Sequence, residues 1–171
     1  VRYRVLTQLF KGITFFGYPY FWLALGLIFL IFQIFHAGIV LGFAGLSYFF
    51  TVFWLKRYFE RKRPHRVHSH LKPLKENVAK YSFPSGHTFM GTIHVLALSL
   101  CYGNLIFLVL ALIFGGLVGF SRIYLGVHNP TDVVISYLIA IACVLLILAS
   151  FSFILNWQAA TVRLYNQSII S

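Results

Sequence analysis

The segment Ser121–Asp132, SRIYLGVHNPTD, is a short polar interruption between two long apolar runs, Asn104–Ser121 and Pro130–Leu155. A run of about 20 mostly apolar residues is long enough to cross a bilayer as a helix. Two such helices joined by a short segment cross the membrane in opposite directions, so the polar segment lies at one membrane face. The stretch therefore predicts a helical protein that crosses the membrane several times.

The whole composition agrees with this interpretation. Apolar residues make up 60% of the chain and charged residues 10%, and the mean hydropathy is +0.84, which lies outside the range of soluble globular proteins. Three further apolar runs, Ile13–Phe35, Ala37–Leu55 and Pro84–Tyr102, bring the number of expected spans to five. We expect one all-α domain over residues 1–171, a polytopic membrane helix bundle in which His36–Gly38 and Cys101–Asn104 form short turns.

Three polar stretches interrupt these runs, and the order of the spans predicts that they meet. They are Lys56–Pro64 (KRYFERKRP), Pro84–His87 (PSGH) and Ser121–Asp132. The second span ends at the first stretch and the third span starts at the second stretch, so both lie on one side of the membrane. The third span leaves that side and the fourth returns to it. All three stretches are therefore expected at the same membrane face.

Positive charge is concentrated beside these stretches. The net charge is +11, from 14 Lys and Arg against three acidic residues, and nine of the 14 fall between Lys56 and Lys80. Such a patch suits an anionic lipid surface or a polyanionic head group. Nucleic acid is not expected, because few aromatic residues are available there to stack on bases. No obligate protein partner is inferred.

A metal site is a further possibility that the basic loop raises. His65, His68 and His70 are closely spaced, but no Cys or Asp neighbours them to complete a ligand set. We therefore expect neither a metal nor another cofactor.

The polar stretches hold residue types that bind phosphate. A phosphoryl group in transfer spreads negative charge over three oxygens. Lys56, Arg63 and Arg122 are candidate fixed cations, since arginine can hold an oxyanion with two donors. Ser85 is the candidate N-cap of a helix, and its hydroxyl and the Gly86 N–H would add neutral donors at a helix N-terminus, which favours anions.

Two histidines and one acid are candidates for the reacting groups. His128 is the candidate nucleophile, because a neutral imidazole can attack phosphorus and the resulting phosphohistidine can be hydrolysed in a second step. Asp132, one helical turn further on, would keep the other ring nitrogen protonated. His87 remains as the general acid for the leaving oxygen and then as the base that activates water. The sequence thus predicts a membrane phosphatase.

Each of these residues also has a simpler interpretation. The basic residues of Lys56–Arg63 would form an ordinary juxtamembrane cluster, and Asp132 would stabilise the start of a helix at Asn129–Pro130. His87 and His128 would be interfacial histidines. A lipid-binding scaffold without activity would follow from these interpretations. The joint occurrence of all the residues at one face favours the enzyme.

The spacing within the three stretches is specific. The first contains Lys56, six further residues and Arg63–Pro64; the second is Pro84–His87; the third is Ser121–Arg122, five residues, His128, three residues and Asp132. This pattern resembles the tripartite signature of the type 2 phosphatidic acid phosphatase superfamily, and no position departs from it. The resemblance implies a metal-independent α-helical membrane enzyme in which the residues have the roles assigned above. These are His128, Asp132 and His87 in catalysis, and Lys56, Arg63, Ser85, Gly86 and Arg122 in phosphate binding.

One feature departs from the resemblance. Members of the superfamily commonly have six spans, whereas five are expected here. We expect the usual first span to be absent and Val1–Lys11 to lie at the membrane surface as an interfacial helix.

The resemblance also bears on substrate and location. The bacterial membrane branch of the superfamily includes phosphatidylglycerophosphate phosphatases, undecaprenyl diphosphate phosphatases and lipid A 1-phosphatases. This compact chain is most similar to the last group, which implies removal of the 1-phosphate of lipid A. The other two activities and a lipid phosphotransferase remain alternatives, whereas haloperoxidases that share the pocket are soluble.

The charge pattern and the resemblance disagree about orientation. The excess of Lys and Arg on the side of the polar stretches would place them in the cytoplasm by the positive-inside rule. The resemblance implies the periplasmic face of a bacterial inner membrane. We expect the periplasmic face, because phosphate binding accounts for several of these cations.

Overall fold

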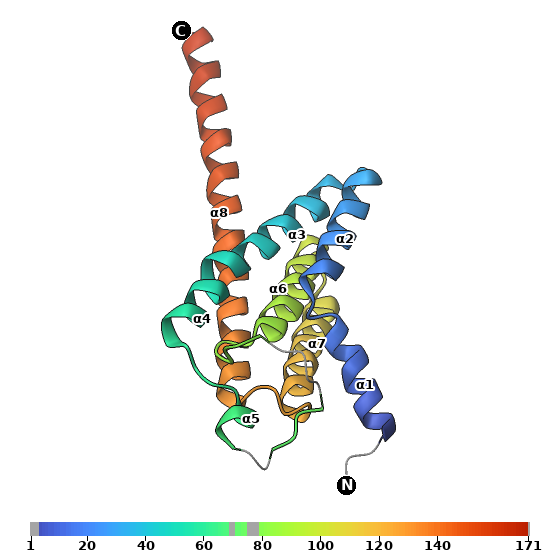
Figure 1. Cartoon of the computed structure of the whole chain (residues 1–171). Coiled ribbons are helices and arrows are strands. Elements are labelled where there is room, and N and C mark those ends of the chain that lie inside the picture. Colours follow the sequence, from blue (N-terminus) through green and yellow to red (C-terminus); the bar gives the residue numbers. More distant parts are fainter. Residues whose placement is uncertain (1–3, 69–70, 75–78, 171) are drawn as a thin grey trace.

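The structure, a computed structural model, describes residues 4–68, 71–74 and 79–170, with side chains as far as residue 150 (Figure 1). Every secondary-structure element in these ranges is a helix, as the sequence predicts. They are α1 (Arg4–Phe15), α2 (Pro19–Ile31), α3 (Phe35–Tyr48), the π-helical segment η1 (Phe49–Phe53), α4 (Trp54–Phe59), α5 (Pro64–Val67), α6 (Gly86–Cys101), α7 (Leu105–Tyr124) and α8 (Pro130–Ile170).

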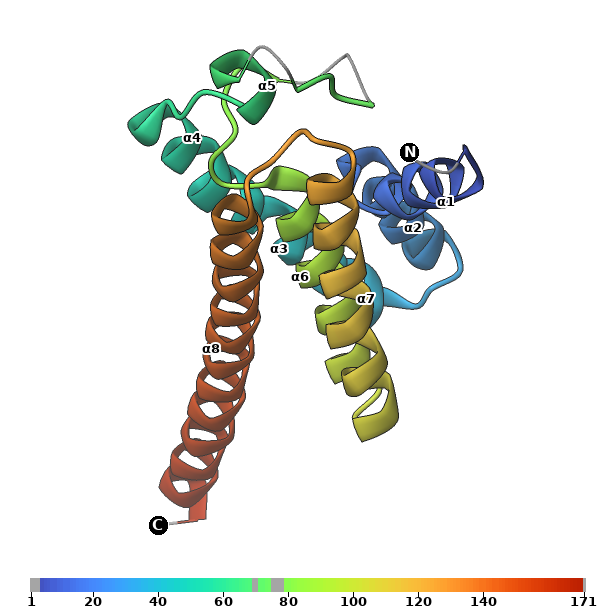
Figure 2. The same cartoon turned by 90° about the horizontal axis from the view of Figure 1, so that it is seen from below.

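Helix α6 forms the centre of the bundle and packs against α3, α7 and α8 (Figure 2). Its apolar side chains Phe89 and Ile93 are fully buried. Glycines on α7 allow the close approach of α6 and α7, because a Cβ on Gly115 would lie 2.7 Å from Thr92 Oγ1 and one on Gly119 would lie 3.1 Å from Thr88 Cγ2. Small residues at such contacts let membrane helices approach each other closely. Both threonines lie on the α6 face that meets α7.

Three helical stretches are long and apolar enough to cross a membrane: Phe35–Val67, Leu105–Tyr124 and Pro130–Ser150. A fourth is counted if α1 and α2, which meet at a bend of 50°, form one broken span. Helix α6 has 16 residues and is therefore only about 24 Å long. The integral membrane architecture is thus clear, while length and composition account for three or four of the five expected spans.

The expected first span, Ile13–Phe35, is not one straight helix. Helix α1 continues to Phe15, four residues beyond the expected interfacial segment, and α2 starts at Pro19. Proline lacks an N–H and occupies the first helical position of α2, where no donor is required. The three residues Phe16–Tyr18 form the break, which we call the α1–α2 elbow.

The prediction of a turn at His36–Gly38 is also wrong. These residues lie in the first turn of α3, and the chain turns at Gln33, which adopts a left-handed backbone with φ of 60°. Gly38 instead serves close packing between α2 and α3. A Cβ there would lie 2.7 Å from Leu30 Cδ2.

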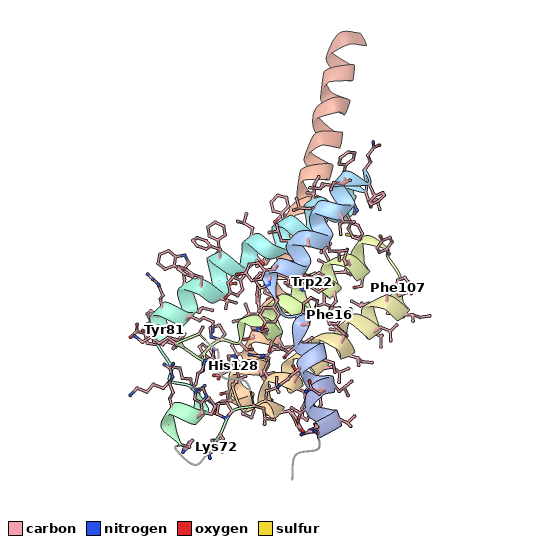
Figure 3. The ribbon with its side chains drawn as sticks, turned by 45° about the vertical axis from the view of Figure 1, so that its right-hand side comes forward. Phe16, Trp22, Lys72, Tyr81, Phe107 and His128 are labelled. Atoms are coloured by element: carbon pink, nitrogen blue, oxygen red, sulfur yellow. The ribbon has the colours of Figure 1, made fainter. Side chains whose placement is uncertain are left out.

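The three polar stretches lie at one end of the bundle. In Figure 1 the α5 segment, the end of α7 and the start of α8 lie at the lower end, while α8 runs away from them to the C-terminus. Figure 3 shows His128 on the same side of the molecule as Tyr81 and Lys72, away from Phe107.

Candidate active site

A cavity of about 150 Å³ opens between the polar stretches and the α1–α2 elbow. Six of the eight residues that the sequence analysis proposes for the site line it: Lys56, Arg63, Gly86, His87, Arg122 and His128. Ser85 and Asp132 are fully buried behind its wall. The remaining lining residues are Gly17, Tyr18, Pro19, Tyr48, Ala79 and Met90.

Two cations reach the cavity from the segment that follows α3. Lys56, on α4, donates from Nζ to the Pro84 carbonyl oxygen at 2.6 Å. Arg63 is the N-cap of α5, and it donates from Nε to the Ala79 carbonyl at 2.5 Å and from Nη1 to the Val127 carbonyl at 2.7 Å. These bonds tie the first polar stretch to the other two and fix both cations at the cavity.

The start of α6 forms another wall. Ser85 is the N-cap, as predicted, and its Oγ accepts from the Thr88 hydroxyl at 2.8 Å and from the Thr88 N–H at 3.5 Å. The Ser85 N–H donates to Ser136 Oγ on α8 at 2.5 Å. The buried Ser85 side chain therefore caps α6 and does not line the cavity, whereas Gly86 does.

Arg122 is the third cation, and α1 holds it. Its Nη1 donates to Thr14 Oγ1 at 3.2 Å, Thr14 lies 2.7 Å from Ser121 Oγ, and Ser121 donates to the Val118 carbonyl. Because the Ser121 hydroxyl donates its proton to the Val118 carbonyl, its oxygen accepts from the Thr14 hydroxyl. Arg122 Nε is buried and has no hydrogen-bond partner within the described ranges. A buried guanidinium donor without a partner is suited to an anion in the cavity.

Arg63 determines the tautomer of His128. Arg63 Nη1 lies 3.2 Å from His128 Nε2, and a guanidinium can only donate. Nε2 therefore accepts and carries the lone pair, so the proton of a neutral ring is on Nδ1. Burial lowers the pKa of His128 to about 3, with further lowering by the three cations and an opposing contribution from Asp132. Burial therefore favours the neutral form of the ring at physiological pH.

Asp132 lies on the other side of the His128 ring. Its Oδ2 is 3.6 Å from His128 Nδ1 and accepts from the Asn129 N–H at 2.9 Å. The second contact is the helix-start bond that the simpler interpretation predicts. Asp132 thus caps α8 and faces His128 at once. The separation of 3.6 Å is longer than a hydrogen bond, and His128 Nδ1 has no hydrogen-bond partner among the described residues.

His87 faces the elbow. Its ring lies 4.7 Å from the Tyr18 ring in an edge-on arrangement, and a Cβ on Gly17 would lie 2.6 Å from His87 Cβ. The Trp22 Nε1–H anchors the elbow by donating to the Phe16 carbonyl at 2.6 Å. The segment before the first motif therefore forms a wall of the cavity.

The sequence analysis missed several residues of the site. Tyr48 lies against Gly86, with its hydroxyl 3.1 Å from where a Cβ would be, and no spacing in the sequence indicates this contact. Arg61 contacts Asp132. The signal for Arg61 is its position two residues before Arg63, because residues two apart on an extended segment point to the same side.

No group of three His, Cys, Asp or Glu side chains that could hold a metal occurs in the part of the chain that the structure describes. His70, the third histidine of the sequence pattern, lies outside the described residues.

Comparisons with known proteins identify the family of the chain. The chain is 38% identical over 111 residues to undecaprenyl-diphosphatase BcrC of Bacillus subtilis, which covers 64% of this chain and 53% of that protein. The fold is similar to the crystal structure of a transmembrane PAP2-type phosphatidylglycerolphosphate phosphatase from Bacillus subtilis, with a TM-score of 0.76, 27% identity, and coverage of 90% of this chain and 80% of the other. LpxE of Aquifex aeolicus gives a TM-score of 0.76 at 29% identity, with 87% and 88% covered. The sequence profile of the PAP2 superfamily matches residues 35–155, a range that contains all eight site residues proposed from the sequence, so the chain belongs to the PAP2 superfamily.

Proposed function

We propose that this protein is a metal-independent lipid phosphatase that transfers a phosphoryl group from a lipid head group to His128 and then to water. One observation carries the proposal: a single cavity is lined by three cations and by the rings of His87 and His128. The same set would be an unfavourable concentration of positive charge unless an anion occupied it. A phosphate is an anion of suitable size and charge.

Lys56, Arg63 and Arg122 bind the phosphate oxygens in this mechanism. Arg63 Nη1 donates to His128 Nε2. A phosphate oxygen can accept this donor instead, which frees the Nε2 lone pair beside the phosphorus atom. Binding of the substrate would therefore release the nucleophile as well as positioning the phosphorus.

Two displacement steps then follow. Nε2 forms a bond to phosphorus while the bond to the leaving oxygen breaks, and His87 gives that oxygen its proton. Asp132 stabilises the positive ring through Nδ1–H. In the second step His87 takes a proton from water, the water oxygen bonds to phosphorus, and the N–P bond breaks. Inorganic phosphate leaves and neutral His128 is restored.

The substrate is proposed from the comparisons and from the position of the site. Apolar side chains of α1, including Val5 and Leu9, are exposed, as expected where a helix borders lipid. The likeness to BcrC favours a polyprenyl diphosphate as the lipid. The 1-phosphate of lipid A, expected from the sequence, and phosphatidylglycerophosphate are the other candidates. A phosphotransferase would use the same phosphohistidine with a lipid acceptor.

We also propose a location. Five helical stretches, α2, α3–α4, α6, α7 and α8, would cross a bacterial inner membrane, with the cavity at its periplasmic face. A reporter fused at the C-terminus tests this orientation, since five spans put the C-terminus opposite the cavity. A periplasmic C-terminus would contradict it.

The activity is tested by phosphate release from undecaprenyl diphosphate, phosphatidylglycerophosphate and lipid A in detergent with EDTA. We expect release by the wild type and by His36→Ala, in which the histidine is exposed on α3, and none by His128→Ala. Equal release by wild type and His128→Ala would refute the mechanism. Phosphorylated lipid in place of free phosphate would indicate the phosphotransferase.

His87 provides a test that separates the substrates. The leaving group of a lipid diphosphate is the lipid monophosphate, whereas the leaving group of a phosphate monoester is an alkoxide. The monophosphate is the weaker base and needs less help from a general acid. We therefore expect His87→Ala to slow hydrolysis of phosphatidylglycerophosphate more than hydrolysis of undecaprenyl diphosphate. Equal losses on both lipids would argue against His87 as the acid.

A further inference from the structure

Arg61 lies between α4 and α5, outside the residues that line the cavity. Its Nη1 donates to Asp132 Oδ1 at 2.9 Å and to Thr131 Oγ1 at 2.8 Å. The Arg61 side chain is 44% exposed, whereas the Asp132 side chain is 0% exposed. A partly exposed arginine of the first polar stretch thus reaches a fully buried carboxylate of the third.

The two oxygens of Asp132 have different partners. Oδ2 accepts from Asn129 and faces His128 Nδ1, while Oδ1 accepts from Arg61. A carboxylate held at both oxygens cannot rotate about its terminal torsion without losing one of these contacts. The Arg61 contact therefore restricts rotation of the carboxylate that faces His128.

Charge provides a second reason for this contact. Lys56, Arg63 and Arg122 line the cavity, where a bound phosphate would engage them. Arg61 does not line it, so a phosphate in the cavity would leave its contact with Asp132 in place. Its cation then offsets the repulsion between the buried carboxylate and the incoming phosphate, which would otherwise weaken binding or move the carboxylate.

We propose that Arg61 is a positioning residue for the reaction, which holds Asp132 Oδ1 so that Oδ2 remains aimed at His128 Nδ1. The inference rests on the proposed function for its effect on rate. The contact itself involves a residue outside the spaced pattern of the three stretches. Because Arg61 does not line the cavity and its guanidinium contacts Asp132, we assign it to Asp132 and not to the substrate.

The test is kinetic and compares Arg61→Gln, Arg61→Lys and Asp132→Asn, singly and with Arg61→Gln and Asp132→Asn combined. A displacement of catalytic groups by about 1 Å costs about 100-fold in rate. We expect Arg61→Gln to lower kcat about 10- to 100-fold with KM changed less than about threefold, and Arg61→Lys to restore part of the loss. In the Asp132→Asn background, Arg61→Gln should have little further effect, because the two residues act as a unit.

Arg57→Gln is the matched control. Arg57 is an exposed arginine of the same polar stretch, on α4, and its guanidinium lies 5.1 Å from the centre of the Phe53 ring. We expect it to retain wild-type kcat. The proposal is overturned if Arg61→Gln acts additively with Asp132→Asn, or if it raises KM and leaves kcat unchanged, since Arg61 would then contact substrate.

A spectroscopic arm distinguishes failure of this inference from failure of the proposed function. In protein with ¹⁵N-labelled histidine, the Nδ1 resonance of His128 reports its contact with Asp132 without turnover. We expect this resonance to shift in Arg61→Gln and not in Arg57→Gln. An unchanged resonance in Arg61→Gln would overturn the positioning role, whereas wild-type protein inactive on every lipid would refute only the phosphatase.

Discussion

Gly17→Ala is the substitution for which the structure gives the sharpest expectation. The new Cβ would lie 2.6 Å from His87 Cβ and 2.9 Å from His87 Cα. Ordinary contacts begin near 3.4 Å, so the elbow and the start of α6 must separate by about 0.8 Å. A change of side-chain rotamer cannot relieve this clash, because the nearest atoms include the backbone of His87.

The expected size of the effect follows from that separation. Overpacking of this kind costs about 1–3 kcal/mol of stability, and a shift of about 1 Å in a catalytic group costs about 100-fold in rate. We therefore expect kcat to fall about 10- to 100-fold in Gly17→Ala. KM should change little, because in the proposed mechanism His87 serves the leaving oxygen and does not hold the phosphate.

The assay is phosphate release in detergent at saturating lipid, with the Tm of each variant measured in parallel. Gly12→Ala is the control, since it lies on α1 and a Cβ there meets nothing within 4 Å; alanine should stabilise that helix by about 0.5–1 kcal/mol. If Gly17→Ala keeps full kcat at an unchanged Tm, the elbow does not position His87 and the reasoning is refuted.

Three further predictions concern other parts of the site. Thr14→Val removes the acceptor of Arg122 Nη1. Since Arg122 would then hold an oxyanion less firmly, inhibition by the phosphate-like oxyanion vanadate should weaken about tenfold. An unchanged inhibition constant would show that Thr14 does not support Arg122. In Gly86→Ala the Cβ would lie 3.0 Å from Tyr48 Cε2, so activity should fall and be partly restored when Tyr48→Leu is added, and no restoration would mean that the damage arises elsewhere. Since burial holds the pKa of His128 at about 3, the ring gains no proton until the pH falls far below 6, and its ¹⁵N resonances should be the same at about pH 7 and about pH 5. A change between these values would contradict the neutral nucleophile.

The catalytic set could be proposed from the sequence because the polar residues are few and the spans order them. A charged or hydrogen-bonding side chain is costly in a bilayer, so residues such as His128 and Arg122 stand out against apolar surroundings. The alternation of spans then predicts that they share a face. In the structure Lys56 contacts Pro84 and Arg63 contacts His128, which brings the three stretches together.

Contacts across the membrane face could not be predicted in the same way. Gly17 and Thr14 precede the first motif by about 40 residues, and nothing in their local pattern indicates that they pack on His87 and Arg122. The bend at Phe16–Tyr18 brings them there. Hydropathy does not locate this bend, because the residues of the expected first span are mostly apolar on both sides of it.

The sequence by itself determined the fold class, the family pattern and the candidate chemistry, because each depends on residue type and on spacing along one chain. Only the tertiary structure decided how the groups are oriented: which nitrogen of His128 carries the proton, which oxygen of Asp132 faces it, and that Arg61 and Tyr48 belong to the site. The physical reason is that a hydrogen bond or close contact is made or lost when the distance between two segments changes by a few tenths of an ångström, and these segments lie far apart in sequence. Residue spacing along a helix fixes only the neighbours on that helix.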